Sequence, residues 1–412
     1  GEINFEEFMD MVAASAPSIG HCNTMGTASS MNSIAEALGM SLTGCAAIPA
    51  PYRERSQMAY DTGFRIVKMV EEDLKPSDIM TKKSFENAIV TASAIGASSN
   101  APPHLIAIAK KININLTLDD WERCGENVPL LVNMQPSGKY LGEGFYKAGG
   151  VPVVMNELNQ NNLLNKDALT VSGKTIDQNL KKISREENEV ICDFKKPIKE
   201  KSGFLVLRSN FFDTAIMKMS VISPEFLTRY LSDPSNPNIF IAKAIVFDGP
   251  EDYHKNINNP DLNIDENCIL VMRGCGPIGY PGSAEVVNMQ PPDELLKKGI
   301  SSLPCIGDGR QSGTSESPSI LNVSPEAAVG GGLAIIKNGD EIKIDLNKKR
   351  ADLLLEDEVI RERLKNNNYK YPDNQTPWQE ISRKFTGQLS DGACLNLEES
   401  YFDIANSKGI PR

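Results

Sequence analysis

The spacing of apolar residues changes part-way along the chain, and this change limits the fold more than any other feature. Up to about residue 165, amphipathic stretches such as MNSIAEALGM and FENAIVTASAIG alternate with short apolar runs such as VPLLVNM, which is typical of a buried strand. Beyond about residue 200, strand-like runs dominate, including FLVLRS, NIFIAKAIVFDG and CILVMRG. This order predicts an α/β fold class, with an α/β part first and a mainly β part with a few helices second.

A polar stretch separates the two parts. Residues 156–200 are rich in Asn, Lys, Gln and Glu, as in NELNQNNLLNKDAL and KKISREENEV, and they hold few apolar anchors. We expect a domain boundary in this stretch, because boundaries fall where few apolar contacts cross. The expected division is an α/β domain over 1–168, a mainly β domain over 169–375, and a tail over 376–412 that packs back on the body.

The clearest local signal in the second part is AIIKNGDEIKIDL. Asn338-Gly339 between two alternating apolar runs predicts a type I′ hairpin turn, since both central residues of that turn need positive φ. The alternation then directs Ile342, Ile344 and Leu346 inward.

Composition excludes several classes of function. Lys and Arg total 43 against 54 Asp and Glu, which gives a formal net charge of -11. A nucleic acid is therefore not an expected partner, because its phosphates would be repelled. No apolar run approaches the roughly 18 to 20 residues needed to cross a bilayer, so no membrane span is expected. The eight cysteines are scattered, which favours reduced thiols in the cytoplasm over a disulfide framework.

The first candidate site is Cys22, in the run HCNTMGTASSMN. The run lies directly before a helix expected to start near Met31, and a helix N-terminus would stabilise a thiolate or an anionic cluster. A capped helix with a buried thiol explains the same residues. Because the sequence has no C-x-x-C pair, a self-contained zinc knuckle or ferredoxin loop is not expected.

The second candidate is Glu285, in RGCGPIGYPGSAEVVNMQPP. This segment leaves a strand and crosses a loop rich in Gly and Pro, where the backbone can approach a ligand closely. The carboxylate can bind a hard cation such as Mg²⁺. The alternative is an acid in the first turn of a helix, where the helix dipole favours it.

The third candidate is the turn around Ser312 and Thr314, in CIGDGRQSGTSESPSILNVSPEAAVGGG. Its hydroxyl and N–H groups can hold an oxyanion, but the spacing is not the G-x-S-x-G of a hydrolase nucleophile. The alternative is a polar turn that leads into a helix, with Ser324 as N-cap and Pro325 in its first turn.

Histidine offers few sources of catalysis, because the chain has only His21, His104 and His254. No H-x-x-x-H pair is present, so a zinc site built on histidine is not expected. His104 follows two prolines and opens an apolar run, which favours an interior ring over a base. His21, beside Cys22, is the one histidine that we retain as a candidate.

Taken together, six ordered blocks make the chain resemble the dihydroxy-acid and sugar-acid dehydratase family. Their variants are most similar to the pentonate branch, which includes arabinonate and xylonate dehydratases. The blocks run from about residue 5 to TPWQE at 376–380 and are HCNTMGTASSMNSIAEALGM, AIGASSNAPPHLIAIA, LVNMQPSGKYLGEGF, FLVLRSNFFDTAIMK, GPIGYPGSAEVVNM and GDGRQSGTSESPSILNVSPEAA.

The resemblance implies a hydro-lyase that removes water from a 2,3-dihydroxy acid and gives the 2-keto-3-deoxy acid. It implies an iron–sulfur cluster, [2Fe-2S] rather than [4Fe-4S], held by three cysteines of which Cys22 matches the last. It implies that Glu285 binds Mg²⁺, that Ser312 is the base and that Thr314 lies beside it in the substrate pocket. It further implies a barrel-like second domain and a homodimer, or a dimer of dimers, as the assembly.

The chemistry of such a reaction suits these residues. A proton α to a carboxylate is weakly acidic, and Mg²⁺ would stabilise the ene-diolate that its removal creates. Ser312 needs a nearby cation to act as a base. Arg310 and Ser315 are further candidates for the substrate pocket, and Lys139 is a second possible source of positive charge. The hydroxyls that follow Ser312 favour sugar acids over branched alkyl acids.

One departure from the family pattern sets a further expectation. The family carries a long segment before the region that matches residue 5, with two cluster cysteines, other Mg²⁺ ligands and a modified lysine. We therefore expect the chain to be the C-terminal part of such an enzyme and to be inactive alone. Two alternatives stay open: a dihydroxy-acid dehydratase of branched-chain amino-acid synthesis, and a non-catalytic fragment or subunit that needs a partner segment.

Overall fold

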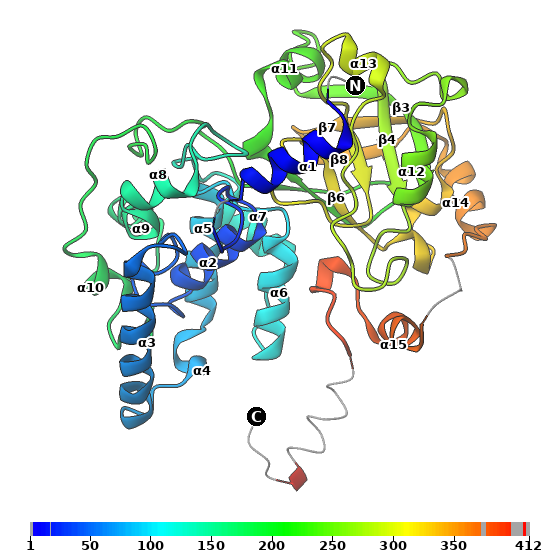
Figure 1. The fold of residues 1–412 in the computed structure, drawn as a ribbon. Coiled ribbons are helices and arrows are strands. Elements are labelled where there is room, and N and C mark those ends of the chain that lie inside the picture. Colours follow the sequence, from blue (N-terminus) through cyan, green and yellow to red (C-terminus); the bar gives the residue numbers. More distant parts are fainter. Residues whose placement is uncertain (1–2, 17, 372–375, 397–406, 409–412) are drawn as a thin grey trace.

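The computed structural model describes residues 3–16, 18–371, 376–396 and 407–408. Its first part is helical, and its second part is a curved sheet flanked by helices (Figure 1). The helices of the first part are α1 (Phe5–Ala14), α2 (Thr27–Ala37), α3 (Arg53–Glu71), α4 (Pro76–Ile79), α5 (Lys82–Ala94), α6 (Ala101–Lys111), α7 (Leu118–Gly125), α8 (Gly142–Lys147), α9 (Gly150–Gln160) and α10 (Ile176–Leu180).

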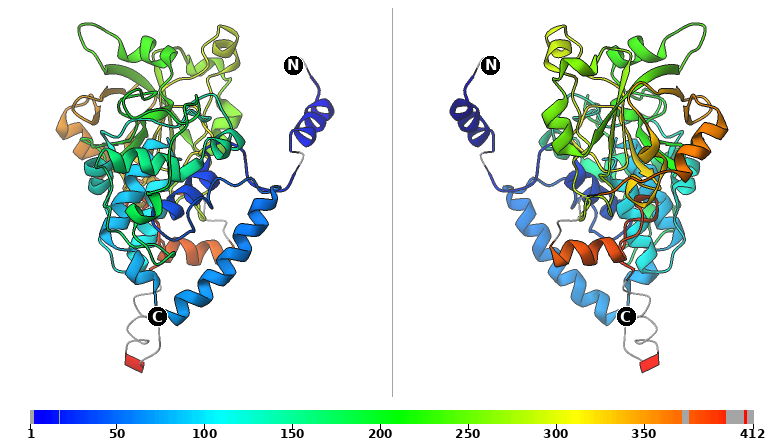
Figure 2. Two further views of the ribbon diagram at one scale, coloured as in Figure 1. Left: turned by 90° about the vertical axis from the view of Figure 1, so that its left-hand side faces the viewer. Right: turned by 90° about the vertical axis from the view of Figure 1, so that its right-hand side faces the viewer.

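Helix α5 is the centre of the helical part. Ten of its thirteen residues are buried, because small Ala, Ser and Thr side chains let α2, α7 and α9 pack closely around it. The peripheral helices differ: α1 has no buried residue and α3 has one, Met69. Both lie at the edge of the molecule (Figure 2).

The strand expected over 128–134 does not form. Among the described residues this segment makes only single bridges, Leu130 with Lys199, Val132 with Ile191 and Met134 with Tyr140. The apolar residues are buried as expected, since Leu130, Leu131 and Val132 are 0% exposed. The run is therefore buried like a strand, but it has no continuous partner strand and is not part of the sheet.

The second part is an eight-stranded sheet that closes almost into a barrel. The strand order is β1-β2-β6-β5-β4-β3-β7-β8, with parallel pairing from β6 through β3 and antiparallel pairing elsewhere. A bridge between Arg208 and Arg350 joins the two edges, which confirms the predicted barrel-like, mainly β second part. The strands are β1 (Phe204–Leu207), β2 (Thr214–Lys218), β3 (Ile239–Asp248), β4 (Cys268–Arg273), β5 (Cys305–Gly307), β6 (Ile320–Ser324), β7 (Glu341–Asp345) and β8 (Arg350–Leu353).

The sheet is buried on both faces. On β1, Phe204 and Val206 join the core shared with the helical part, whereas Leu205 and Leu207 point to the second core inside the barrel. This explains why β1 and β4 are nearly continuous apolar runs. The helices of the second part are α11 (Pro224–Phe226), α12 (Pro250–Asn256), α13 (Asp293–Lys297), α14 (Asp357–Lys365) and α15 (Pro377–Phe385).

The prediction of a type I′ hairpin at Asn338-Gly339 is wrong, although the prediction that Ile342 and Ile344 point inward is confirmed. Gly339 has φ of +88°, but Asn338 is not among the residues with positive φ, so the turn is not type I′. The residues before it form a 3₁₀ helix, Gly332–Ile335, and β7 pairs with β3 and β8 instead. Ile342 and Ile344 are fully buried on β7.

The described part of the C-terminal tail contacts the body. Arg383 Nε donates to the Ile278 carbonyl oxygen at 2.7 Å, and the Lys110 ammonium lies 2.5 Å from the Asp391 carboxylate. Residues 397–406 and 409–412 of the expected tail lie outside the described residues.

The domain boundaries after 168 and 375 stay predictions. No helix in the described ranges is long and apolar enough to cross a membrane.

Candidate active site

Glu285 lies in the long loop between β4 and α13, not in a helix. The interpretation as a first-turn helix acid is therefore wrong. Its Oε1 accepts hydrogen bonds from Thr27 Oγ1 at 3.1 Å and Asn100 Nδ2 at 2.5 Å. Thr27 is the first residue of α2 and Asn100 is the N-cap of α6, so two helix N-termini meet at this carboxylate.

A half-buried guanidinium stands beside Glu285. Arg310 Nη1 lies 3.9 Å from Glu285 Oε1 and donates to Asn100 Oδ1 at 3.5 Å, while Nε donates to the Ser283 carbonyl oxygen at 2.7 Å. Burial lowers the pKa of Arg310 from its usual value. Burial, and then the charge of Arg310, also lowers the pKa of His104, whereas Glu285 raises it. A carboxylate, a guanidinium and an imidazole from three separate segments therefore lie in one neighbourhood.

Ser312 and Thr314 lie together in the loop between β5 and β6. Their hydroxyl oxygens are 2.8 Å apart, and the Thr314 N–H donates to Ser312 Oγ at 3.4 Å. Ser312 is partly exposed and Thr314 is exposed, so both hydroxyls reach solvent. Nearby, Ser324 ends β6 and Glu326 is the N-cap of the following 3₁₀ helix, so the expected cap at Ser324 is wrong.

Two glycines let the Ser312 loop reach the helical part. A Cβ on Gly313 would lie 2.6 Å from the Thr27 nitrogen and 2.5 Å from Ser98 Oγ, which no side chain tolerates. A Cβ on Gly26 would lie 3.1 Å from Thr314 Cγ2. Glycine at both places therefore allows the backbone before α2 to touch the turn that carries Ser312 and Thr314.

Asn288 links the two loops of the second part. Its Nδ2 donates to the Glu285 carbonyl oxygen at 2.6 Å, and its Oδ1 accepts from the Ser312 N–H at 3.2 Å. Asn100 Nδ2 also donates to the Gln311 carbonyl oxygen at 3.0 Å. Glu285 and Ser312 are therefore held in one hydrogen-bonded network.

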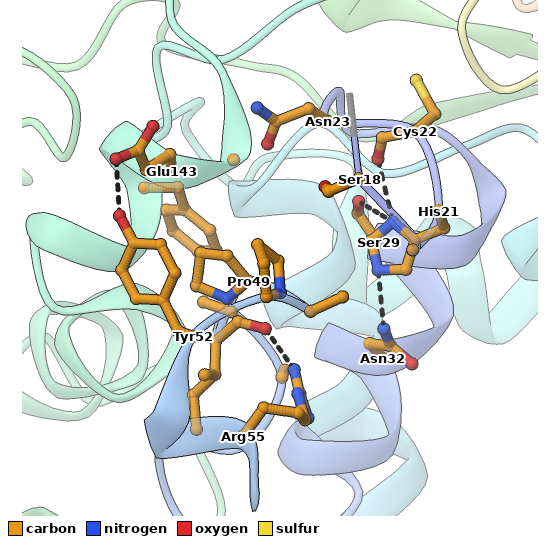
Figure 3. Close-up of a pocket in the computed structure, with 18 of the residues that line it drawn as sticks. Ser18, His21, Cys22, Asn23, Ser29, Asn32, Pro49, Tyr52, Arg55 and Glu143 are labelled. Carbon is orange, nitrogen blue, oxygen red and sulfur yellow. Dashed lines mark hydrogen bonds between the residues drawn. The ribbon is translucent and has the colours of Figure 1, made fainter. Parts of the chain in front are cut away.

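Cys22 lines a cavity that does not include Glu285, Ser312 or Thr314. Helix α2 starts at Thr27, one turn earlier than expected, and Cys22 lies in the exposed segment before it, with Sγ 3.1 Å from Thr24 Oγ1. A cavity of about 560 Å³ is lined by Cys22 together with His21, Asn32, Tyr52, Arg55 and Glu143, but not by Glu285, Ser312 or Thr314. In Figure 3 the Cys22 sulfur points away from Pro49 and Arg55.

Two family models cover most of the chain. The N-terminal model of dihydroxy-acid/6-phosphogluconate dehydratases matches residues 1–179, and the C-terminal model matches residues 189–393. The chain belongs to this dehydratase family.

Curated relatives agree with this membership. The chain is 59% identical over 405 residues to a D-xylonate dehydratase from Caulobacter vibrioides, which covers 98% of the chain and 68% of the relative. It is 50% identical to an L-arabinonate dehydratase from Rhizobium leguminosarum, covering 88% and 61%, and 37% identical to a dihydroxy-acid dehydratase from Acetivibrio thermocellus, covering 89% and 64%. The chain thus spans roughly two thirds of the length of these dehydratases.

Sequence reasoning missed several residues of the candidate site. Thr27 and Asn100 were not candidates, although both lie in the quoted family blocks, and His104 was interpreted as an interior ring. The available signal was the position of Asn100 two residues before the pair Pro102-Pro103, where a helix start is expected. Lys139 is exposed and stacks on Tyr140, whereas Arg310 is the cation beside Glu285.

Proposed function

We propose that this chain carries the dehydration site of a sugar-acid dehydratase, which converts an aldonate to its 2-keto-3-deoxy acid. One observation carries the proposal: a carboxylate at Glu285 and a paired hydroxyl at Ser312 belong to one network that also includes the starts of α2 and α6. The similarity to relatives named for xylonate and arabinonate supports a pentonate as the substrate.

Glu285 fits a role as a Mg²⁺ ligand. Oε1 is occupied by Thr27 and Asn100, whereas no side chain or backbone group in the described ranges bonds to Oε2. Mg²⁺ takes one or two carboxylates and completes its shell with water and substrate oxygens, so a single protein carboxylate is compatible. When bound, the ion would supply positive charge at the substrate carboxylate and 2-hydroxyl. Thr27 and Asn100 would hold Glu285 in orientation for it.

Ser312 would act as the base that takes the proton from C2. A serine hydroxyl is too weakly acidic to ionise unaided, and it needs hydrogen bonds to its charged form. The Thr314 hydroxyl and the Thr314 N–H both lie within hydrogen-bond distance of Ser312 Oγ. Two hydrogen-bond donors to one oxygen would stabilise the Ser312 alkoxide. Thr314 would therefore assist Ser312 as the base.

Arg310 and Ser315 are the proposed substrate-binding residues. Arg310 supplies positive charge beside Glu285, which suits an anionic substrate. Ser315 follows the base in the same turn, and its hydroxyl accepts from the Ser317 N–H at 3.2 Å. Hydroxyls at this place match the hydroxyls of a sugar acid better than the alkyl tail of a branched-chain acid.

We further propose Cys22 as one thiolate ligand of an iron–sulfur cluster, [2Fe-2S] rather than [4Fe-4S]. Its exposed thiol supports a role as a ligand. In the described ranges, no group of three His, Cys, Asp or Glu residues lies close enough to hold a metal ion. These residues therefore contribute one ligand and do not fit a complete cluster by themselves. Eight free thiols favour the cytoplasm, and the proposed assembly is a homodimer or a dimer of dimers.

The test is a comparison of substrates and variants in an anaerobically purified enzyme that contains this chain and a complete cluster, with Mg²⁺ added. We expect 2-keto-3-deoxy acid from pentonates and none from 2,3-dihydroxyisovalerate; the reverse preference would overturn the sugar-acid assignment. Ser312→Ala should lower turnover by roughly 10²–10⁴-fold, the usual contribution of a general base, whereas the control Ser235→Ala, in an exposed loop before β3, should retain it. Turnover retained by Ser312→Ala would exclude Ser312 as the base.

Binding of Mn²⁺, measured by electron paramagnetic resonance, tests Glu285 without reference to activity. Mn²⁺ is a suitable probe because it accepts the same oxygen ligands as Mg²⁺. We expect Glu285→Gln to bind the ion at least roughly tenfold more weakly, because the amide lacks the charge that attracts a hard cation. The control Glu358→Gln, on the exposed face of α14, should bind as the wild type does. Equal binding by Glu285→Gln would exclude this carboxylate as a ligand.

A further inference from the structure

Helix α3 presents an apolar stripe to solvent. Tyr60, Phe64 and Val67 are 62%, 60% and 56% exposed, and Val70 on the flank of the stripe is 76% exposed. The helix has nineteen residues, and Met69 is its only buried one. It lies at the periphery of the molecule, separate from the barrel (Figure 2). Contiguous apolar surface of this kind marks an interaction site more often than a free surface.

The same helix face carries one opposite charge at each end. Positions 53, 60, 64, 67 and 71 are spaced at multiples of three to four residues, so they share one side of the helix. Arg53 begins α3 and its side chain is 94% exposed; Glu71 ends α3 and its side chain is 58% exposed. The outer face therefore reads, from one end to the other, as a cation, an apolar stripe and an anion.

This order is self-complementary when two copies of the helix pack antiparallel. Arg53 and Glu71 lie nine residues on either side of position 62, and Tyr60 and Phe64 lie two residues on either side of it. A two-fold axis at position 62 therefore sets Arg53 of each copy against Glu71 of the other and sets Tyr60 against Phe64. A two-fold contact requires this reciprocity, in which residue i meets j and j meets i.

We propose that α3 is a self-association surface, on which a second copy of this chain docks its own α3 in antiparallel orientation. This inference deepens the proposed dimer and is independent of Glu285 and Ser312. The inner face of the helix is occupied: Arg65 bonds to the Val171 carbonyl oxygen and pairs with Glu72 at 2.6 Å. The local pairs of Arg53 with Glu54 and of Lys68 with Glu71 are exposed, so they compete only weakly with contacts across the interface.

Helix α1 also exposes apolar residues, but its charges give no comparable pairing. Phe5, Phe8 and Met9 are exposed, and the charged residues of the helix are the acids Glu6, Glu7 and Asp10. Two copies of this helix would therefore bring like charges together. Charge complementarity thus favours α3 as the surface that meets its own copy.

The test is charge reversal followed by sedimentation velocity over a range of concentrations. Arg53→Glu and Glu71→Arg should each weaken the dimer about tenfold or more, because each reversal puts like charges together at two symmetry-related contacts. Mixing the two single variants should restore the dimer, since the acid introduced at position 53 then meets the base introduced at position 71. The double variant should restore it as well. Both changes suit the helix dipole, so the folded helix should persist, which circular dichroism checks.

An apolar substitution with a matched control gives a second measurement. Val67→Asp should weaken the dimer by more than about a hundredfold, because it places a charge within the buried stripe. Ile66→Asp is the control: Ile66 is 53% exposed but points to another side of the helix, so the dimer should persist. A monomeric wild type, a dimer insensitive to Val67→Asp, or single variants that do not complement each other on mixing would overturn the proposal. These measurements do not depend on turnover, so they do not test the dehydratase assignment.

Discussion

Two buried regions of the barrel hold ionisable side chains in opposite surroundings. At the end of β2, Lys218 is 6% exposed, and its Nζ has no hydrogen-bond partner among the described residues. Beside β5 and β6, Asp308 and Glu326 are also buried, but their carboxylates accept hydrogen bonds from several N–H groups. The comparison separates buried ionisable groups that form hydrogen bonds from one that forms none among the described residues.

The compensated region supports the candidate site. Asp308 accepts from the N–H groups of Gly274, Cys275 and Ala327 at 2.8 to 3.0 Å. Glu326 accepts from the N–H of Gly279 at 2.8 Å. These bonds fix the start of the loop that goes on to Glu285. The carboxylates therefore accept hydrogen bonds from a loop whose backbone N–H groups would otherwise be unpaired. In the described ranges, the Lys218 ammonium forms no such bond.

Removing the Asp308 carboxylate should have the largest effect. Asp308→Ala leaves three N–H groups without acceptors, two of them buried and that of Gly274 partly buried. Each is worth about 1–3 kcal/mol, so we expect a loss of roughly 5 kcal/mol in the free energy of unfolding. Urea unfolding followed by fluorescence measures it. Asp308→Asn keeps one carbonyl acceptor and should lose less. A loss below about 1 kcal/mol in Asp308→Ala would show that the N–H groups find other partners.

Removing the Lys218 charge should have the opposite sign. Burial, and then the charge of Lys199, lowers the pKa of Lys218 from 10.5 to about 7. A lowered pKa means that the folded state holds the proton less well than the unfolded chain, so stability falls as the pH drops from about 10.5 to 7. At pH 7, Lys218→Met should stabilise the protein by roughly 4 kcal/mol.

The neighbouring lysine is the matched control for this prediction. Lys199 Nζ donates to the carbonyl oxygens of Ser220 and Ile222 at 2.6 and 2.8 Å. Lys199→Met should therefore destabilise the protein by about 1–3 kcal/mol, because two partly buried acceptors lose their donor. Thermal unfolding at pH 7 and pH 10 measures both variants. Equal changes at the two lysines would remove the distinction between a paired and an unpaired buried cation.

The second part of the fold was the more predictable, for a physical reason. Strands β1 and β4 are buried at nearly every position, so their apolar runs are continuous and bounded by turns. The run at 128–134 is also apolar and buried, but among the described residues it forms only single bridges and no continuous strand pairing. Tertiary packing decides which segments lie side by side. A local sequence pattern contains no information on that pairing. The Asn338-Gly339 turn failed for the same reason, because the segment before it packs as a 3₁₀ helix.

Some residues of the candidate site could likewise be predicted from the sequence, and others could not. Glu285, Ser312 and Thr314 were candidates from their local loops, and the family resemblance gave each of them a role. Thr27 and Asn100 lie 258 and 185 positions from Glu285 in the sequence, so no spacing rule connects them to it. Cys22 lines a cavity that does not include Glu285. Its role as a cluster ligand stays a prediction.

Glu326 gives the smallest effect and the sharpest test of the comparison, because its pH dependence has the opposite sign to that of Lys218. Burial raises the pKa of Glu326 from 4.5 to about 7, although hydrogen bonds from Gly279 and Ile278 lower it. A raised pKa means that stability is fully present below pH 4.5 and declines as the pH rises to about 7, by at most about 3 kcal/mol. Glu326→Gln should remove this decline, because the amide does not ionise, while the exposed control Glu358→Gln should keep it. Urea unfolding at half-unit steps between pH 4.5 and 8 measures the difference between each variant and the wild type. If Glu326→Gln follows the wild-type curve, this carboxylate is ionised throughout, and its hydrogen bonds offset its burial in full.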